Sequence, residues 1–364
     1  MFIARGGDLD GAERQLSYLA HDLDRTRFEP LVVLDAECPL AEQLRTAGVE
    51  VHIRTLHPWR SMRGAVMRYV DAFALTRLAR ERGIALVHAS DLWKSRYALF
   101  VAARCGLPAV IHVRGPIDER GIRKHHLADA AALIPIAQRY QEDLIRLGLP
   151  AERVRLIDDA VDLARFRSDV PGRDAFRAQY CVGERVAVGL VGRVEPFKRV
   201  LEFLEVVAIA QRIAPTQAAY FVIGQDGPES YMQQVRAAVA RLGLQETVRF
   251  LGRLDDMPQV LAGLDILVTL SGGSVMFEAM ACGKTVLSVR QDDRPSEHTR
   301  HNDTAWFVKS STPGPVAEAL LQLMGDAELR ARLGRSASEW VKDHLSRKLM
   351  AERTQALYET LLAP

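Results

Sequence analysis

Strand-like and helix-like segments alternate along almost the whole sequence. In the first half, short runs of residues that favour β-structure stand at 2–4, 31–34, 49–53, 85–88, 109–113, 133–136 and 154–157. Stretches with helical spacing separate them, among them 11–23, 65–82 and 138–147. Such alternation predicts an α/β fold built on a mostly parallel, doubly wound sheet.

The alternation lapses once and then resumes, which predicts a second domain. A polar, Arg-rich segment at 162–184 contains Pro171-Gly172. Later strand-like runs stand at 186–191, 220–223, 248–251, 266–270, 286–289 and 306–308, and helical segments at 196–213, 230–242 and 257–264. At 364 residues the chain also exceeds the size at which one core usually stops growing. Two Rossmann-like domains, each with ligands at its strand carboxyl ends, would place a site in an interdomain cleft.

Composition narrows the class of protein. Hydrophobic residues make up 48% and charged residues 26%, and the net charge of +2 is too small to indicate a nucleic-acid partner. The four cysteines have no pairing or metal-ligand spacing, which favours a reducing compartment. No signal peptide is recognisable, and no apolar run reaches the roughly 18 residues of a membrane span. The chain is therefore expected in the cytoplasm.

The stretch 270–284 carries the strongest sign of a binding site. It follows one strand-like run and precedes another, and its Gly272-Gly273 pair allows a tight turn that lies close to a ligand. Ser274 is placed to cap a short helix, whose first N–H groups would bind an anion by donating hydrogen bonds to it. Glu278, one turn into that helix, either reaches sugar hydroxyls beside the anion or only complements the helix dipole.

A second candidate site follows the strand at 186–191. Arg193 and Lys198 flank Pro196, a residue suited to the first position of a helix. The planar guanidinium and the mobile ammonium together suit a diphosphate. The alternative is an ordinary basic helix start, since Arg199 adds a further positive charge there.

Three motifs resemble a known family. Residues 277–284, Phe-Glu-Ala-Met-Ala-Cys-Gly-Lys, resemble the donor-site signature of family-4 retaining glycosyltransferases of the GT-B fold. Residues 191–199 resemble the Gly-Arg…Lys diphosphate clamp of that family, and 11–14 stand where the family has a glycine-rich loop. The resemblance implies an acceptor-binding domain at 1–168, a donor-binding domain at 169–345, and a last helix at 346–364 that crosses back to the first domain.

The resemblance also implies the reaction and the residues that perform it. A sugar would pass, with retention and without a metal or other cofactor, from a nucleotide-diphosphate sugar (UDP-sugar favoured) to a glycan, lipid-linked or small-molecule acceptor. Arg114, Arg193 and Lys198 would be catalytic, with Arg114 stabilising the departing phosphate. The implied donor-binding residues are Gly11, Arg193, Lys198, Arg253, Leu254, Ser271, Gly273, Ser274, Val275 and Glu278.

One departure from the family pattern leaves a second function open. The family has another Glu eight residues before the one at 278, and Leu270 holds that position here. If Leu270 faces the donor sugar, the site is either rebuilt for a different sugar or has lost sugar recognition. The second case describes a non-catalytic nucleotide-sugar binder or partner subunit.

Two further patterns bear on partners. Asp pairs occur at 8/10, 22/24, 255/256 and 292/293, but none has a second cluster of ligands beside it, so no metal site is predicted. The segment 54–82 contains seven Arg interleaved with Trp59, Met62, Met67 and Phe73. It fits either peripheral contact with an anionic membrane or a solvated helix face above an ordinary core.

Overall fold

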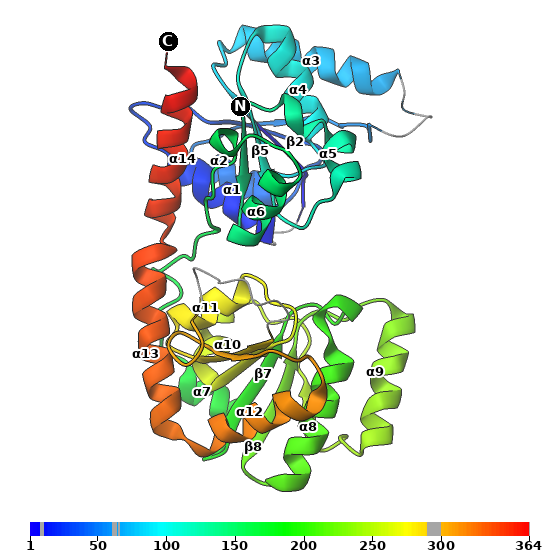
Figure 1. The fold of residues 1–364 in the computed structure, drawn as a ribbon, viewed down its shortest axis with the longest axis vertical. Coiled ribbons are helices and arrows are strands. Elements are labelled where there is room, and N and C mark those ends of the chain that lie inside the picture. Colours follow the sequence, from blue (N-terminus) through cyan, green and yellow to red (C-terminus); the bar gives the residue numbers. More distant parts are fainter. Residues whose placement is uncertain (8–10, 60–63, 65, 290–299, 364) are drawn as a thin grey trace. The chain divides into compact units, whose positions relative to one another are not determined.

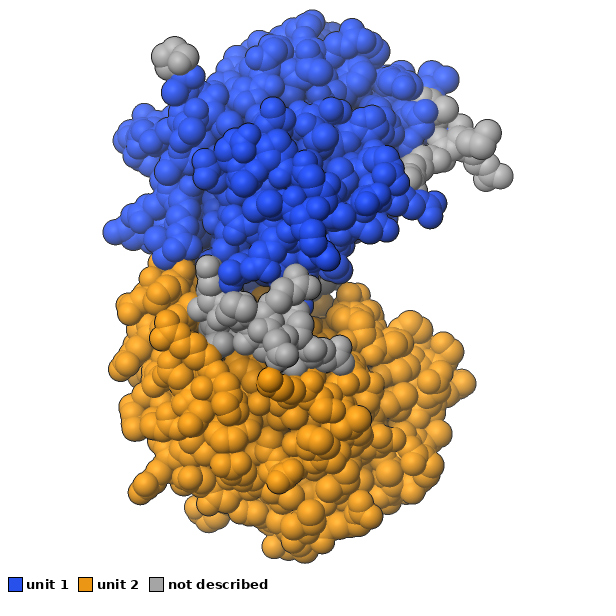
Figure 2. All heavy atoms as spheres, in the orientation of Figure 1, with its two compact units in different colours: residues 1–160, 347–364 blue, residues 161–346 orange. Residues whose placement is uncertain are grey.

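The structure is a computed structural model that describes residues 1–7, 11–59, 64, 66–289 and 300–363. The chain forms two compact units: unit 1 is Met1–Ala160 with Arg347–Pro364, and unit 2 is Val161–Ser346 (Figure 2). At the edge of unit 2, the Val161 N–H donates to the Leu345 carbonyl at 2.7 Å. The boundaries at 168/169 and 345/346, and the roles assigned to the domains, stay predictions.

Unit 1 is a parallel sheet in which each strand is followed by a helix (Figure 1). Its strands are β1 (Phe2–Ala4), β2 (Leu31–Leu34), β3 (Glu50–Ile53), β4 (Val87–Ala89), β5 (Ala109–Val113) and β6 (Ala132–Pro135). Its helices are α1 (Gly11–Asp22), α2 (Pro39–Thr46), α3 (Met67–Glu81), α4 (Ser95–Cys105), α5 (Glu119–His125), α6 (Gln138–Arg146) and α14 (Arg347–Leu362). The 3-10 turns are η1 (Leu127–Asp129) and η2 (Ala151–Arg153).

Unit 2 repeats this plan with its own sheet. Its strands are β7 (Val186–Val191), β8 (Ala218–Ile223), β9 (Val248–Phe250), β10 (Ile266–Thr269), β11 (Thr285–Val289) and β12 (Trp306–Val308). Its helices are α7 (Arg173–Gln179), α8 (Val200–Ile213), α9 (Glu229–Leu242), α10 (Met257–Gly263), α11 (Val275–Ala281), α12 (Pro313–Gly325) and α13 (Ala327–His344), with the 3-10 turn η3 (Pro196–Lys198).

The two sheets share one topology. The strand order is β3-β2-β1-β4-β5-β6 in unit 1 and β9-β8-β7-β10-β11-β12 in unit 2, and all paired strands run parallel. The predicted doubly wound α/β fold is therefore confirmed. In each unit the chain reverses direction across the sheet beside its first strand, and the loops after β1 and β4, or after β7 and β10, flank this topological switch point.

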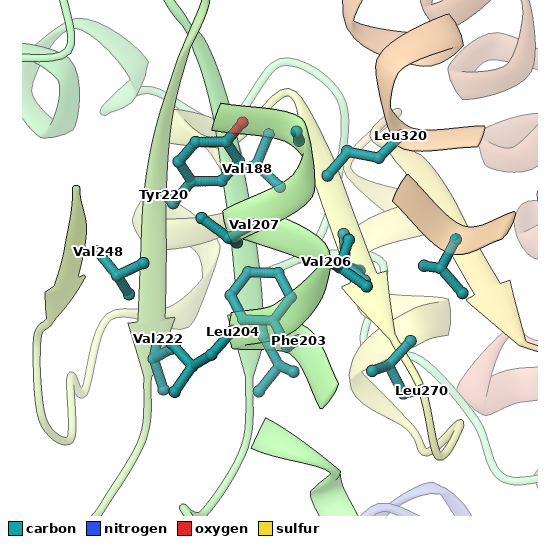
Figure 3. Close-up of a cluster of buried hydrophobic side chains, with 14 of the residues drawn as sticks. Val188, Phe203, Leu204, Val206, Val207, Tyr220, Val222, Val248, Leu270 and Leu320 are labelled. Carbon is teal, nitrogen blue, oxygen red and sulfur yellow. The ribbon is translucent and has the colours of Figure 1, made fainter. Parts of the chain in front are cut away.

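Each sheet has a hydrophobic core on both faces, as strands buried between helix layers require. In unit 2, one core joins the sheet to α8, α9 and α12, and the other joins it to α10, α11 and α13. Figure 3 shows the first of these, where Phe203, Leu204 and Val207 of α8 lie against Val188 and Val222. Burial of such side chains contributes roughly 1.5–3 kcal/mol each, so these cores hold the strand ends that carry the loops.

Two expected elements differ from the structure. Residues 154–157 form a single bridge from Val154 to Leu133 in place of a strand, although the Arg155 N–H donates to the Leu133 carbonyl along the edge of β6. The helix expected at 196–213 is split: Pro196 opens the short turn η3, and α8 begins only at Val200. Arg199 between them has φ +60°, a left-handed conformation that no α-helix continues through.

The C-terminal helix α14 belongs to unit 1, where it packs against α1. Its Arg347 guanidinium bonds the Asp22 carboxylate at 2.6 and 2.7 Å. The crossing expected for residues 346–364, like the domain boundaries, stays a prediction. Among the described residues, none of the helices is long and apolar enough to cross a membrane; the cytoplasmic location stays a prediction.

Candidate functional site

The candidate site lies at the topological switch point of unit 2. Because β7 and β10 are adjacent and parallel, the loops that follow them emerge at the same edge of the sheet. Residues 192–199 form the first loop and residues 270–274 the second. In open α/β sheets this is the usual place for a ligand.

Lys198 is held between the two loops. A methyl group added to Gly192 would meet the Lys198 Cε at 3.0 Å, and one added to Gly273 would lie 3.3 Å from its Nζ. Gly192 has φ +143° and Gly273 has φ +116°, so both backbones also favour glycine. The ammonium group therefore lies directly against two glycine backbones, and the left-handed Arg199 is what turns the chain back after it.

The charge of Lys198 is only partly compensated. Burial lowers the pKa of Lys198, the neighbouring Arg193 lowers it further, and Glu195 opposes both. Among the described residues Lys198 forms no ion pair, whereas Arg193 pairs with Glu195 at 3.0 Å. Arg193 is more than half exposed, so this pair contributes little to stability and leaves the guanidinium accessible.

The glycine turn after β10 has the predicted conformation, but its serine does not cap. Gly272 has φ +69°, and its carbonyl accepts a bond from the Thr269 hydroxyl at 3.1 Å, a contact that the sequence did not indicate. Ser274 already has helical angles (φ −60°, ψ −31°), and its side chain makes no capping bond. A capping side chain needs extended backbone at that residue, so the expectation for Ser274 was wrong.

The remaining predicted residues of this turn lie at the same edge. Ser271 and Ser274 are exposed, Val275 is half-buried, and the Glu278 N–H donates to the Ser274 carbonyl at 3.2 Å. The Glu278 side chain is buried and interacts within the protein. The expected contact between Glu278 and sugar hydroxyls of the donor stays a prediction.

The loops after β8 and β9 continue the site across the sheet edge. A Cβ on Gly224 would overlap the Gly192 carbonyl oxygen, and the Gly224 N–H donates to the Gly252 carbonyl at 2.8 Å. The next two residues are Arg253, which pairs with Asp255 at 3.5 Å, and Leu254, which packs against the core. The glycine-containing loops after β7, β8 and β9 are thus in backbone contact with one another, and the first of them carries Lys198.

Leu270 does not line this site. Its side chain is 4% exposed and lies in the same hydrophobic core as Val206 and Val268. Figure 3 shows Leu270 and Val206 in this core. Ile266, Val268 and Leu270 share this face of β10 because side chains alternate along a strand. The expectation that Leu270 faces the donor sugar is therefore wrong, and the argument for lost sugar recognition disappears with it.

Two predicted site residues belong to unit 1: Arg114 is hydrogen-bonded within the unit, and Gly11 lies in open space. The Arg114 guanidinium, half-buried after β5, donates to the Asp159 carboxylate at 2.5 Å and to the Ser90 carbonyl at 3.0 Å. Gly11 begins α1, and a Cβ there would meet nothing within 4 Å. Gly6 is the crowded glycine in this loop, since its Cβ would lie 2.7 Å from the Ala36 carbonyl oxygen.

Among the described residues, no three His, Cys, Asp or Glu side chains are grouped so that they could hold a metal ion. Asp22 is held by Arg347, Asp24 bonds Thr26, and Asp255 pairs with Arg253. The pairs 8/10 and 292/293 lie outside the described residues. Metal independence stays a prediction.

Comparison with known proteins agrees with this geometry. The family model "Glycosyltransferase Family 4" matches residues 9–165, and "Glycosyl transferases group 1" matches residues 173–340. The N-acetyl-alpha-D-glucosaminyl L-malate synthase of Bacillus anthracis is 29% identical over 46% of this chain and 45% of its own length. A GDP-mannose-dependent alpha-(1-6)-phosphatidylinositol monomannoside mannosyltransferase of Mycobacterium tuberculosis is 28% identical over 53% of this chain and 52% of its own.

These matches span about half the length of the two relatives. Across the whole chain, the fold resembles that of HepE from Anabaena in complex with UDP and glucose, with a TM-score of 0.82, 22% identity, and coverage of 100% of this chain and 99% of that one. The two family models together account for both units, and the sheets agree with the fold of that structure. The chain belongs to the family-4 glycosyltransferases of the GT-B fold.

Proposed function

We propose that the chain transfers a sugar, with retention of configuration, from a nucleoside-diphosphate sugar bound by unit 2. The observation that carries the proposal is Lys198, a partly desolvated ammonium group lying between the Gly192 and Gly273 backbones. Glycine backbones leave room for a ligand to approach, and a partly desolvated cation that forms no ion pair with any described residue favours an anion.

The donor would lie along the loops at the edge of the sheet. Lys198 and the accessible Arg193 would hold the diphosphate, and the turn through Gly273, Ser274 and Val275 would present backbone N–H groups to phosphate and sugar. Ser271 is exposed beside that turn and is assigned to the sugar. Further along the edge, the backbone of Arg253 and Leu254 would contact the base.

The chemistry requires stabilisation of the leaving group more than a strong base. The bond between the sugar C1 and the diphosphate oxygen breaks, and a bond from C1 to the acceptor oxygen forms on the same face. The acceptor hydroxyl proton passes to the departing phosphate oxygen. Lys198 and Arg193 would stabilise the negative charge that develops there, without a metal. Arg114 is proposed to stabilise the departing phosphate. For this role its guanidinium must contact the phosphate while it keeps its hydrogen bond to Asp159.

The base and the acceptor are proposed only as classes. A UDP-sugar is favoured, with support from the UDP complex of the HepE structure, while the mycobacterial relative is named for GDP-mannose. The names of the relatives include an L-malate synthase and a phosphatidylinositol mannoside enzyme, which supports an acceptor class of small molecules, lipid-linked sugars or glycans. We assign the acceptor to unit 1.

Nucleotide binding tests the proposal directly. UDP, GDP, ADP and their sugars are titrated against thermal unfolding, where a ligand at about 100 times its dissociation constant adds roughly 2.7 kcal/mol. We expect one diphosphate series to stabilise the wild type and to lose most of this effect in Lys198→Met. The control is Lys348→Met, which removes an exposed lysine of α14.

Turnover then separates a transferase from a binder. With the donor identified by binding, release of free nucleotide is measured with and without candidate acceptors. A transferase releases nucleotide at least slowly by hydrolysis, and Lys198→Ala or Arg193→Ala should reduce that rate about a hundredfold or more. Binding without any release would overturn the catalytic proposal, and wild-type rates in the two variants would overturn the assignment of the site.

A further inference from the structure

The outer face of α3 carries an unusual concentration of exposed apolar side chains. Val66, Met67, Tyr69, Val70 and Phe73 have between 44% and 75% of their surface accessible. They are five of the twelve large apolar residues classed as exposed in the described part of the chain, gathered within eight positions. Single exposed apolar residues are ordinary, but a contiguous patch indicates an interaction surface.

This patch is not needed for the core of unit 1. Helix α3 already buries its opposite face through Ala72, Leu75 and Ala79, where it covers the sheet beside α4. Residues 66, 70, 73 and 77 follow one another at spacings of four and three, so they lie along one stripe of the helix. The helix is therefore apolar on two faces, one of which meets solvent.

Positive charge surrounds the patch. The Arg68 guanidinium lies 5.4 Å from the centre of the Tyr69 ring, and that of Arg104, from α4, lies 5.1 Å from the Phe73 ring. Arg77 continues the stripe toward the end of the helix and is largely exposed. Guanidinium groups therefore border the apolar side chains along the length of the patch.

Of the two carboxylates of α3, one is buried away from the patch and the other offsets only the charge of Arg77 at the end of the patch. Asp71 is buried on the inner side and bonded to the ring of His57 at 2.8 Å. Glu81 stands at the end of the helix and is paired with Arg77 at 2.6 Å. Between Val66 and Arg77, a stretch that the structure describes throughout, the outer face therefore presents aromatic and aliphatic side chains with guanidinium groups and no accessible acid.

We propose that this face of α3, comprising Val66, Met67, Tyr69, Val70 and Phe73 with the surrounding Arg68, Arg77 and Arg104, docks on an anionic phospholipid surface. The apolar side chains would enter the interfacial region, while the guanidinium groups would bind the phosphates above it. A lipid surface fits better than a protein groove, because a convex helix face lined by arginine matches a layer that is apolar inside and anionic outside. Arg60 and Arg63, part of the segment singled out in the sequence, lie outside the described residues.

Sedimentation with vesicles tests the proposal on the full chain. Phosphatidylcholine vesicles with and without about 30% phosphatidylglycerol are compared at low salt, and then with salt raised to about 0.5 M, where screening shortens to a few ångströms. We expect binding to the anionic vesicles alone and release by salt. Met67→Ser, Val70→Ser and Phe73→Ser combined should lower the partition coefficient by about tenfold or more.

Matched control variants test whether a loss of exposed apolar side chains or of positive charge anywhere on the surface would weaken binding equally. Ile145→Ser with Ile213→Ser removes exposed apolar residues from α6 and α8, and Arg335→Glu makes the same charge change as Arg77→Glu but in α13. Both controls should bind as the wild type does, while Arg77→Glu should weaken binding. All the substituted side chains are exposed, and thermal unfolding verifies that each variant is folded.

Two results would overturn the proposal. One is an absence of binding to anionic vesicles at low salt by the folded wild type. The other is a concentration-dependent dimer, seen by light scattering, that the triple serine variant abolishes while vesicle binding persists; the patch would then be an interface between two copies of this chain. Neither result bears on donor binding by unit 2, which the nucleotide titration measures separately.

Discussion

The two units have the same strand order, but the charged side chains at their topological switch points are paired differently. In unit 1, Arg5 after β1 pairs with Asp91 after β4 at 3.0 Å, and Lys94 pairs with Asp35 after β2 at 2.5 Å. In unit 2, the corresponding loops bring Lys198 against two glycine backbones, and among the described residues that lysine has no ion pair.

The difference separates charges that hold a fold together from charges available to a ligand. The Lys94 side chain is almost fully buried, and its charge is compensated by Asp35, so it closes the edge of unit 1. Lys198 is partly buried, and among the described residues it has only the nearby Glu195 charge and no ion pair, so part of its desolvation cost remains for a bound anion to relieve. Topology alone marks both edges as candidate sites, and the pairing of the charges distinguishes them.

The largest effect is expected from placing a charge just below the edge of unit 2. Leu270→Glu would bury a carboxylate among Val206, Val268 and their neighbours, and an uncompensated buried charge costs about 3–5 kcal/mol. Ser271→Glu, one residue later and exposed, should change stability little. Urea denaturation compares the two. A stable Leu270→Glu variant with an altered preference among donors would restore Leu270 to the sugar site.

Acid should weaken unit 1 through histidines buried beneath its edge. His88 bonds the Tyr358 hydroxyl and, at 2.8 Å, the ring of His112, and burial lowers the pKa of His88 to about 3 from its usual 6.5. Between these values the unfolded chain binds the proton and the folded chain does not, so stability is lost as pH falls. From pH 6.5 to about 4 the loss is about 3 kcal/mol.

Hydrogen exchange of the β4 and β5 amides measures this loss where it arises. His88→Gln removes one of the two buried histidines whose pKa is lowered, His88 and His112, and should reduce the pH dependence of protection over that range. His21→Gln, at an exposed position of α1, serves as the control and should retain the wild-type slope. The same slope in His88→Gln and the wild type would show that other groups cause the acid sensitivity.

Removing each lysine tests the contrast between the two edges most directly. Lys94→Met leaves the Asp35 carboxylate with the Gly6 N–H but without its ion-pair partner, and should cost about 1–3 kcal/mol of stability. Lys198→Met removes a partly desolvated charge that has no ion pair with any described residue, so stability should hold or rise slightly while nucleotide binding is lost. Paired denaturation and binding measurements show the two patterns. A comparable loss of stability in both variants would mean that Lys198 also has a structural partner.

The sequence predicted what depends on local pattern. Alternation revealed both sheets, and the order Gly-Arg…Lys with the later glycine pair indicated the two loops that meet at Lys198. The alternation of side chains along the strand, through Ile266, Val268 and Leu270, also indicated that Leu270 faces the core. The family spacing of eight residues before Glu278 favoured a position at the sugar site instead, and that interpretation was wrong.

Other features depend on contacts between distant residues, which pattern does not reveal. The Lys94–Asp35 pair joins residues 59 apart, and the His88–Tyr358 bond joins residues 270 apart. The split of the helix expected at 196–213 rests on one left-handed residue, Arg199, of a type that rarely adopts this conformation. These features follow from how the elements pack, so they appear only in the folded structure.

The smallest effects concern two glycines that the family resemblance treats alike. Gly11 begins α1 and its Cβ would meet nothing, so Gly11→Ala should be neutral or add about 0.4–1 kcal/mol by reducing the entropy of the unfolded chain. Gly273 has φ +116°, and its Cβ would press on the Lys198 Nζ. Because an L side chain is strained in that left-handed region, Gly273→Ala should cost about 1–2 kcal/mol. The same change should also weaken nucleotide binding, because it displaces the ammonium group, whereas Gly11→Ala should leave binding as it is. Weaker binding in Gly11→Ala with unchanged stability would instead support the prediction that Gly11 is a donor-binding residue.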